Sequence, residues 1–83
     1  MPTIAIVDGV AIRFYPDEHP PTHFHAVFAE FADQIRIAPP EVLRGSLPAT
    51  KLKAVLSWAS RNREGLMEAW LALEAGRKPR RLS

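Results

Sequence analysis

Six polar residues of types that can bind and react with a phosphate group alternate with apolar residues in the first half of the chain. They are Arg13, Tyr15, His23, His25, Gln34 and Arg36. Arginine binds phosphate oxygens through two parallel hydrogen bonds, and histidine can accept or donate a proton near neutral pH. Tyrosine can donate a hydrogen bond or stack on a base. Because the six include no carboxylate, they indicate a surface that binds phosphate or cleaves RNA without a metal.

In such a cleavage, one histidine or the tyrosine would remove the proton from the 2′-hydroxyl group, and the arginines would stabilise the pentavalent phosphorus. The candidate catalytic residues are Arg13, Tyr15, His23, His25 and Arg36. Gln34 is a candidate binding residue, and His19 would support the neighbouring loop. The alternative is that this polar surface only contacts water or a partner chain.

A histidine-bound metal is a second interpretation of the same segment. His19, His23 and His25 have the spacing H-x3-H-x-H, and residues two apart on a strand project to one side. Three histidines and an open water position form a catalytic zinc site, which Asp17 or Glu18 could assist as ligand or base. We favour the metal-free interpretation and keep a zinc hydrolase as the alternative. In a third interpretation, His19 and His23 only bind backbone groups of the proline loop.

The polar residues lie in segments whose alternation predicts β-strands. Ile4–Val7 and Val10–Tyr15 predict a hairpin with a three-residue loop, Val7–Gly9, in which Gly9 is left-handed. That register pairs Ile6 with Val10 and Ile4 with Ile12, so the large apolar residues share one face.

Further strands are expected along the chain. His23–Ala29 and Gln34–Ile37 predict two strands joined by a turn around Phe31–Asp33, and Glu41–Arg44 predicts a short fifth. In every strand the polar set alternates with the apolar set, which places the six polar side chains on one face of the sheet.

Helical periodicity follows Gly45. A first helix is expected to begin near Pro48, and Asn62 is the expected N-cap of a second, which Gly76 ends. Trp58 and Trp70 are expected to pack the helices on the sheet. The order predicts an α+β fold, with an antiparallel sheet of four to five strands and a C-terminal helical hairpin on one face. We expect one domain over residues 1–76, with strands in 1–45 and helices in 47–76, followed by a basic tail, 77–83.

Composition and charge exclude several classes of protein. The 83 residues include no cysteine, which excludes disulfides and thiolate metal sites. No apolar run approaches the roughly 20 residues of a membrane span, and no signal peptide is recognisable, so we expect a cytoplasmic protein without membrane contact. The net charge of +2 is the sum of −3 over residues 1–50 and +5 over residues 51–83. The tail residues Arg77, Lys78, Arg80 and Arg81 could bind nucleic acid or an acidic partner, or could simply be solvated.

The chain also resembles a known family through particular motifs. The most specific one is His-x-Pro-Pro-x-His-Phe-His with an upstream Arg-x-Tyr. It is formed by Arg13, Tyr15, His19, Pro20, Pro21, His23, Phe24 and His25. With these residues the chain resembles the domain-of-unknown-function 4160 family of small bacterial proteins, over nearly its whole length to about Gly76. Gly65 departs from the family, whose members usually have a good helix former there, and is expected to weaken the start of the second helix.

Members of this family are commonly encoded beside another small protein of unknown function, family 2442, and such pairs look like type II toxin–antitoxin modules. The resemblance therefore implies a module component whose partner is a small cognate protein. With the phosphate-binding residue set, we expect this chain to be the toxin, acting on RNA or another phosphate-containing target. The alternative is an antitoxin or a non-catalytic adaptor whose polar sheet face is a protein interface. Self-association into a homo-oligomer stays open.

Overall fold

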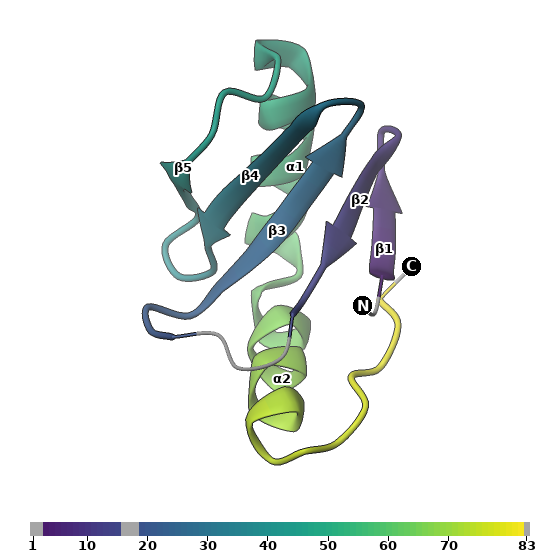
Figure 1. Cartoon of the computed structure of the whole chain (residues 1–83), viewed down its shortest axis with the longest axis vertical. Coiled ribbons are helices and arrows are strands. Elements are labelled where there is room, and N and C mark those ends of the chain that lie inside the picture. Colours follow the sequence, from purple (N-terminus) through teal and green to yellow (C-terminus); the bar gives the residue numbers. More distant parts are fainter. Residues whose placement is uncertain (1–2, 16–18, 83) are drawn as a thin grey trace.

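The computed structural model describes residues 3–15 and 19–82 of the chain. Its elements are β1 (Thr3–Val7), β2 (Val10–Arg13), β3 (His23–Phe28), β4 (Phe31–Arg36), β5 (Glu41–Arg44), α1 (Ala49–Arg61) and α2 (Arg63–Glu74). The strands form one antiparallel sheet in the order β1-β2-β3-β4-β5, and both helices cover the same face of it (Figure 1). The fold is α+β, as the sequence predicted. No described helix has the length and apolar character needed to cross a membrane.

The core lies between the inner face of the sheet, which the helices cover, and the helices themselves. Phe14 and Phe24 are completely buried there. Phe14 contacts Trp70 of α2 and Phe24 contacts Trp58 of α1, with ring centroids 6.5 and 6.4 Å apart and the edge of one ring toward the face of the other. The two tryptophans therefore pack the helices on the sheet, which confirms the prediction.

The turn of the first hairpin differs from the predicted one. Val7 pairs with Val10, which leaves only Asp8 and Gly9 in the turn, with φ angles of 50° and 81°. Two-residue turns with positive φ at both positions match the twist of the strands that they join. The prediction of a three-residue loop is wrong because Asp8, like Gly9, adopts the left-handed conformation.

The shorter turn changes which residues of β1 face the core. Ile6 pairs with Ala11 rather than Val10 and is 53% exposed, so it points away from the helices. Ile4 is nevertheless buried, because an irregularity between Thr3 and Ala5 shifts the alternation of the strand. The prediction that Ile6 shares the core face of Ile4 is therefore wrong.

The turn between β3 and β4 lies two residues earlier than predicted. Phe28 pairs with Phe31, and the turn consists of Ala29, with a φ of 52°, and Glu30. Asp33 consequently lies within β4, and its side chain is buried on the inner face. Aspartate is uncommon inside strands. It is accommodated here because its carboxylate accepts hydrogen bonds from backbone amides of the segment that connects β5 to α1.

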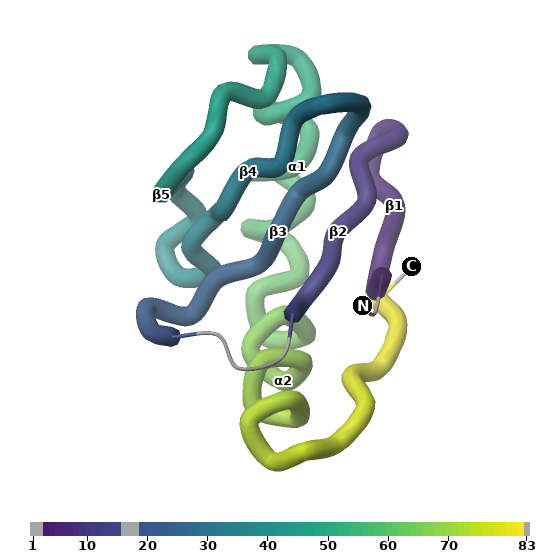
Figure 2. Tube along the Cα trace, in the orientation of Figure 1, coloured from purple at the N-terminus to yellow at the C-terminus, as the bar shows by residue number. Residues whose placement is uncertain are grey.

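The two helices follow one another end to end along the sheet instead of folding back as a hairpin (Figures 1 and 2). Only Asn62 separates them, and a reversal of direction needs a longer connection. The backbone N–H of Asn62 donates to the Ala59 carbonyl, and its carbonyl accepts from Leu66, so hydrogen bonding continues across the junction. The Asn62 side chain donates to the Trp58 carbonyl at 2.9 Å, and it therefore caps the end of α1 rather than the start of α2.

The segment after α2 returns to the sheet. The Leu82 N–H donates to the Ile4 carbonyl at 2.7 Å, and Pro79 is buried. The Leu82 side chain packs against Gly65 of α2, where a Cβ atom would lie 2.8 Å from Leu82 Cδ2. Gly65 thus provides the space for the returning chain, which is why a better helix former is absent from this position.

We predict that Asp33→Ala lowers the free energy of unfolding by about 2–4 kcal/mol. The substitution leaves the backbone amides of Ser46 and Leu47 without their charged acceptor and opens a space in the core. Urea unfolding followed by circular dichroism measures the change, with Glu74→Ala at an exposed helix position as the control. A loss of less than about 0.5 kcal/mol would show that this carboxylate does not hold the connection in place.

Candidate functional site

The predicted polar residues lie on the outer face of the sheet, which the helices do not cover. Strand pairing places one residue from each strand in a single row across this face. We call it the outer row, and it consists of Thr3, Arg13, His25, Gln34 and Arg44. Neighbouring strands are about 4.8 Å apart, so adjacent members of the row lie within reach of one small ligand.

Aromatic rings join this row to the core at its β2–β3 side. The ring of Tyr15 contacts that of His25 edge-on, with centroids 4.3 Å apart. His25 contacts His23 at 5.3 Å, and His23 contacts Trp70 of α2 at 5.4 Å. The four rings form a continuous series from the helix to the outer face, so the position of His25 depends on packed neighbours.

The two histidines of β3 have different surroundings. His23 is buried, and its Nδ1 atom lies 2.8 Å from the Pro21 carbonyl oxygen. Because a carbonyl oxygen only accepts, Nδ1 bears the hydrogen in this contact. His25 is half-buried and belongs to the outer row. His25 is therefore the more accessible of the two histidines, and His23 supports the loop before β3.

The two predicted arginines also differ. Arg13 Nε donates to Thr3 Oγ1 at 3.1 Å, and within the described residues its guanidinium forms no ion pair. Arg36 lies opposite His23 and Glu41, donates through Nε to the Pro39 carbonyl at 3.3 Å, and forms an ion pair with Glu41. Among the described residues, a carboxylate therefore neutralises the charge of Arg36 but not that of Arg13.

The outer row also contains residues that sequence reasoning missed. Arg44 pairs with Gln34 because an irregularity in β5 inserts Leu43 between the residues opposite Gln34 and Ile35. A regular strand would have placed Arg44 and Glu41 on opposite faces, and no local sequence signal marks the extra residue. Thr3 enters the row through the similar irregularity in β1.

His19 is exposed in the loop that precedes β3, next to the cis peptide bond between Pro20 and Pro21. Across residues 3–15 and 19–82, no three histidine, aspartate or glutamate side chains come together as ligands for a metal ion. The structure brings His23 and His25 into contact without forming such a group with His19. Asp17 and Glu18, the expected helpers of a metal, lie outside the described residues.

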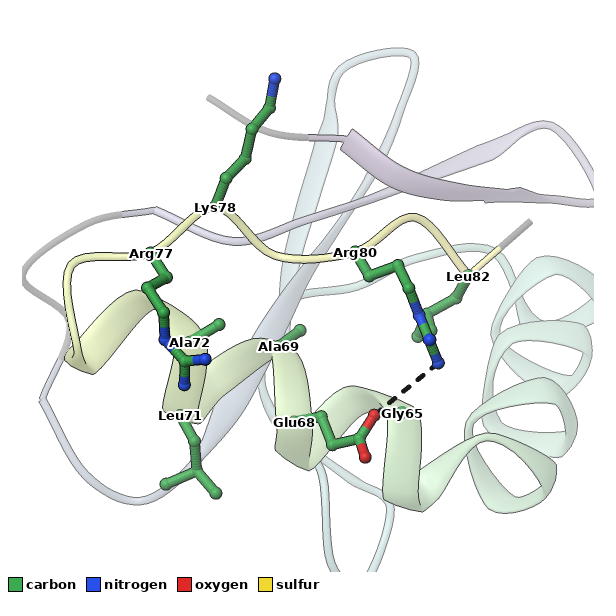
Figure 3. A pocket seen from close by; sticks show the side chains of 9 residues that line it. All are labelled: Gly65, Glu68, Ala69, Leu71, Ala72, Arg77, Lys78, Arg80 and Leu82. Carbon is green, nitrogen blue, oxygen red and sulfur yellow. Dashed lines mark ion pairs between the residues drawn. The ribbon is translucent and has the colours of Figure 1, made fainter.

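The basic residues of the tail lie apart from the outer row. Arg77, Lys78 and Arg80 line a pocket of about 340 Å³ between α2 and the returning chain (Figure 3). Arg80 points toward Glu68, with 3.9 Å between the charged atoms, and Lys78 points away from the helix. Both members of that pair are mostly solvated, so the pair contributes little to stability. Arg81 is exposed as well. The structure therefore joins none of the four to the histidines of β3.

The fold and the site together define a small α+β domain with a polar, helix-free sheet face. The chain belongs to the family described as domain of unknown function DUF4160, whose model matches residues 9–71. The matched segment includes Arg13, Tyr15, His23, His25 and Arg36 and ends before the tail. No curated protein and no solved structure matches the chain.

We predict that Glu41→Gln changes the free energy of unfolding by less than about 1 kcal/mol and increases the affinity for single-stranded RNA. The Arg36–Glu41 pair is partly solvated, with side chains 31% and 57% exposed, so its contribution to stability is small. Removal of the carboxylate leaves the Arg36 charge available to a phosphate group.

Urea unfolding and fluorescence anisotropy of a labelled oligoribonucleotide measure the two effects. Glu30→Gln, in the exposed turn between β3 and β4, removes the same charge and serves as the control. Equal affinities of the Glu41→Gln and Glu30→Gln proteins would exclude Arg36 from RNA binding.

Proposed function

We propose that the chain is the toxin of a type II toxin–antitoxin module and that its outer row binds and cleaves RNA without a metal. The observation that supports this function best is the outer row itself. It places His25 between Arg13 and Gln34, with no carboxylate among its five residues. A proton acceptor beside a cationic phosphate ligand is the minimum that such a reaction needs.

The roles follow from the surroundings of each side chain. His25 removes the proton of the 2′-hydroxyl group, whose oxygen then attacks the adjacent phosphorus. Arg13 stabilises the additional negative charge of the pentavalent phosphorus, and Gln34 hydrogen-bonds a phosphate oxygen. The 5′-oxygen leaves with a proton from Tyr15, whose ring contacts His25. His23 fixes the orientation of the His25 ring.

The ends of the outer row extend the binding surface. Arg44 lies two strands from His25, at a distance that suits a neighbouring phosphate group of the same RNA strand. Arg36 contributes less, because Glu41 already neutralises its charge. The basic tail is a separate positive surface that attracts RNA only weakly.

A second candidate function is that of an antitoxin or adaptor whose outer face binds a partner protein. This function is favoured by a second row of residues on the outer face. Strand pairing places four apolar residues in this row, next to the outer row. They are Ile6, Ala11, Val27 and Ala32. Ile6 is 53% exposed, and exposed apolar residues beside arginine are typical of protein interfaces. In a module, the same surface would bind the neutralising partner.

We predict that production of this protein alone arrests bacterial growth with fragmentation of RNA, and that His25→Ala and Arg13→Ala abolish both effects. With purified protein, loss of the proton acceptor should reduce the cleavage rate by about 10²–10⁴-fold. Arg63→Ala, on α2, removes the same charge as Arg13→Ala far from the outer row and should remain toxic.

Growth curves and RNA gels of the four cultures distinguish the candidates. Arrest with intact RNA would exclude RNA cleavage and leave a toxin with another target. Normal growth with the wild-type protein would contradict the toxin and favour the antitoxin or adaptor.

A further inference from the structure

The outer edge of β5 is an open sheet edge. β5 is the last strand in the order, and within the described residues no segment pairs with its free side. At the opposite edge, the Leu82 N–H donates to the Ile4 carbonyl of β1, so the returning chain partly covers that edge. Unpaired backbone groups at a sheet edge are a template for pairing with another strand.

The residues of β5 are complementary to a second copy of the same strand. Its sequence is Glu41-Val42-Leu43-Arg44, with opposite charges at its two ends. When two such strands pair antiparallel about a two-fold axis over all four residues, Glu41 of one copy lies opposite Arg44 of the other, and the reverse pair forms as well. Opposite charges across such a pair are stabilising, whereas an edge with like charges would repel its own copy.

The irregularity in β5 makes this charge pairing geometrically consistent. Glu41 pairs with Arg36 and Arg44 pairs with Gln34, so both lie on the outer face of the sheet. In a strand without the additional residue, positions 41 and 44 would point to opposite faces. With it, both ion pairs of the paired strands form on the same face. The Glu41 side chain is 57% exposed and can accept a second arginine beside Arg36.

We propose that this edge is a homodimer interface, in which β5 of two copies pair antiparallel and join the two five-stranded sheets into one. Between the two ion pairs, Val42 and Leu43 of one copy meet Leu43 and Val42 of the other. Leu43 is 40% exposed in the single chain and becomes covered. Because only four residues pair on each side, the dimer is weak and depends on concentration.

The dimer also connects the two outer rows. Arg44, at the end of one outer row, lies beside Glu41 and then Arg36 of the second copy. The polar faces of both copies therefore point to the same side of the joined sheet. The ion pair with Glu41 of the second copy engages the same Arg44 that the proposed function assigns to a neighbouring phosphate group. His25 and Arg13 lie on β3 and β2, away from this interface, so self-association and RNA cleavage can each fail without the other.

Charge exchange tests the interface. Sedimentation equilibrium at low ionic strength, at protein concentrations up to about 1 mM, should show a monomer–dimer equilibrium for the wild-type protein. Glu41→Arg and Arg44→Glu each place like charges opposite one another, and each should weaken association by about tenfold or more. An equimolar mixture of the two variants should form heterodimers, and a chain with both substitutions should dimerise like the wild type.

The variants control for one another. Arg44→Glu keeps the Arg36–Glu41 pair, so it tests the interface even if Glu41→Arg impairs folding. The doubly substituted chain has the same change at position 41 as the Glu41→Arg variant, but opposite charges again face each other across its dimer. A difference in association between the two therefore reports on charge pairing and not on the local change at position 41. A monomeric wild-type protein, single variants that associate like the wild type, or no recovery in the mixture of folded variants would overturn the proposal.

Discussion

The buried carboxylate of Asp33 is the interaction on which the arrangement of this domain depends. Its two oxygens accept hydrogen bonds from the backbone N–H groups of Ser46 and Leu47, with nitrogen–oxygen distances of 3.1 Å. These two residues lie where the chain leaves the sheet and turns toward α1. Gly45 permits this approach, since a Cβ atom there would lie 2.1 Å from Asp33 Oδ1 and its φ is 128°. Because the turn is held from the inner face, the chain is directed toward that face, where both helices pack. The outer face is left uncovered.

This division gives the two faces of the sheet different roles. The inner face buries the aromatic rings that contact Trp58 and Trp70, and the outer face presents the polar row. His23 connects the two faces. Its position in β3 is on the outer face, but its ring is buried against Trp70 of α2. The ring of His25 packs on this support, so the core positions a histidine of the outer face. Preorganisation of this kind is what an acid–base or phosphate-binding group requires.

Much of this architecture could be predicted from local patterns, and two of the errors share one physical cause. Alternation over His23–Ala29 predicts the polar and apolar faces of β3 correctly, because a strand has period two. Asp33 falls in the turn expected around Phe31–Asp33, but it lies in β4. Its carboxylate binds backbone amides 13 and 14 residues away, which no local pattern reveals. Arg44 was missed because an additional residue in β5 changes the face to which it points. In each case a long-range or irregular pairing overrode the local signal.

Amide chemical-shift mapping tests most directly the proposal that the outer row binds RNA phosphates. ¹⁵N-labelled protein is titrated with a short single-stranded oligoribonucleotide at two salt concentrations. We predict saturable shifts centred on Arg13, His25, Gln34 and Arg44. The affinity should be weaker at higher salt, because each phosphate contact releases counterions. The Arg13→Ala protein should show a weaker affinity with the same fold. Shifts confined to the tail residues 77–82, or none at all, would contradict the claim.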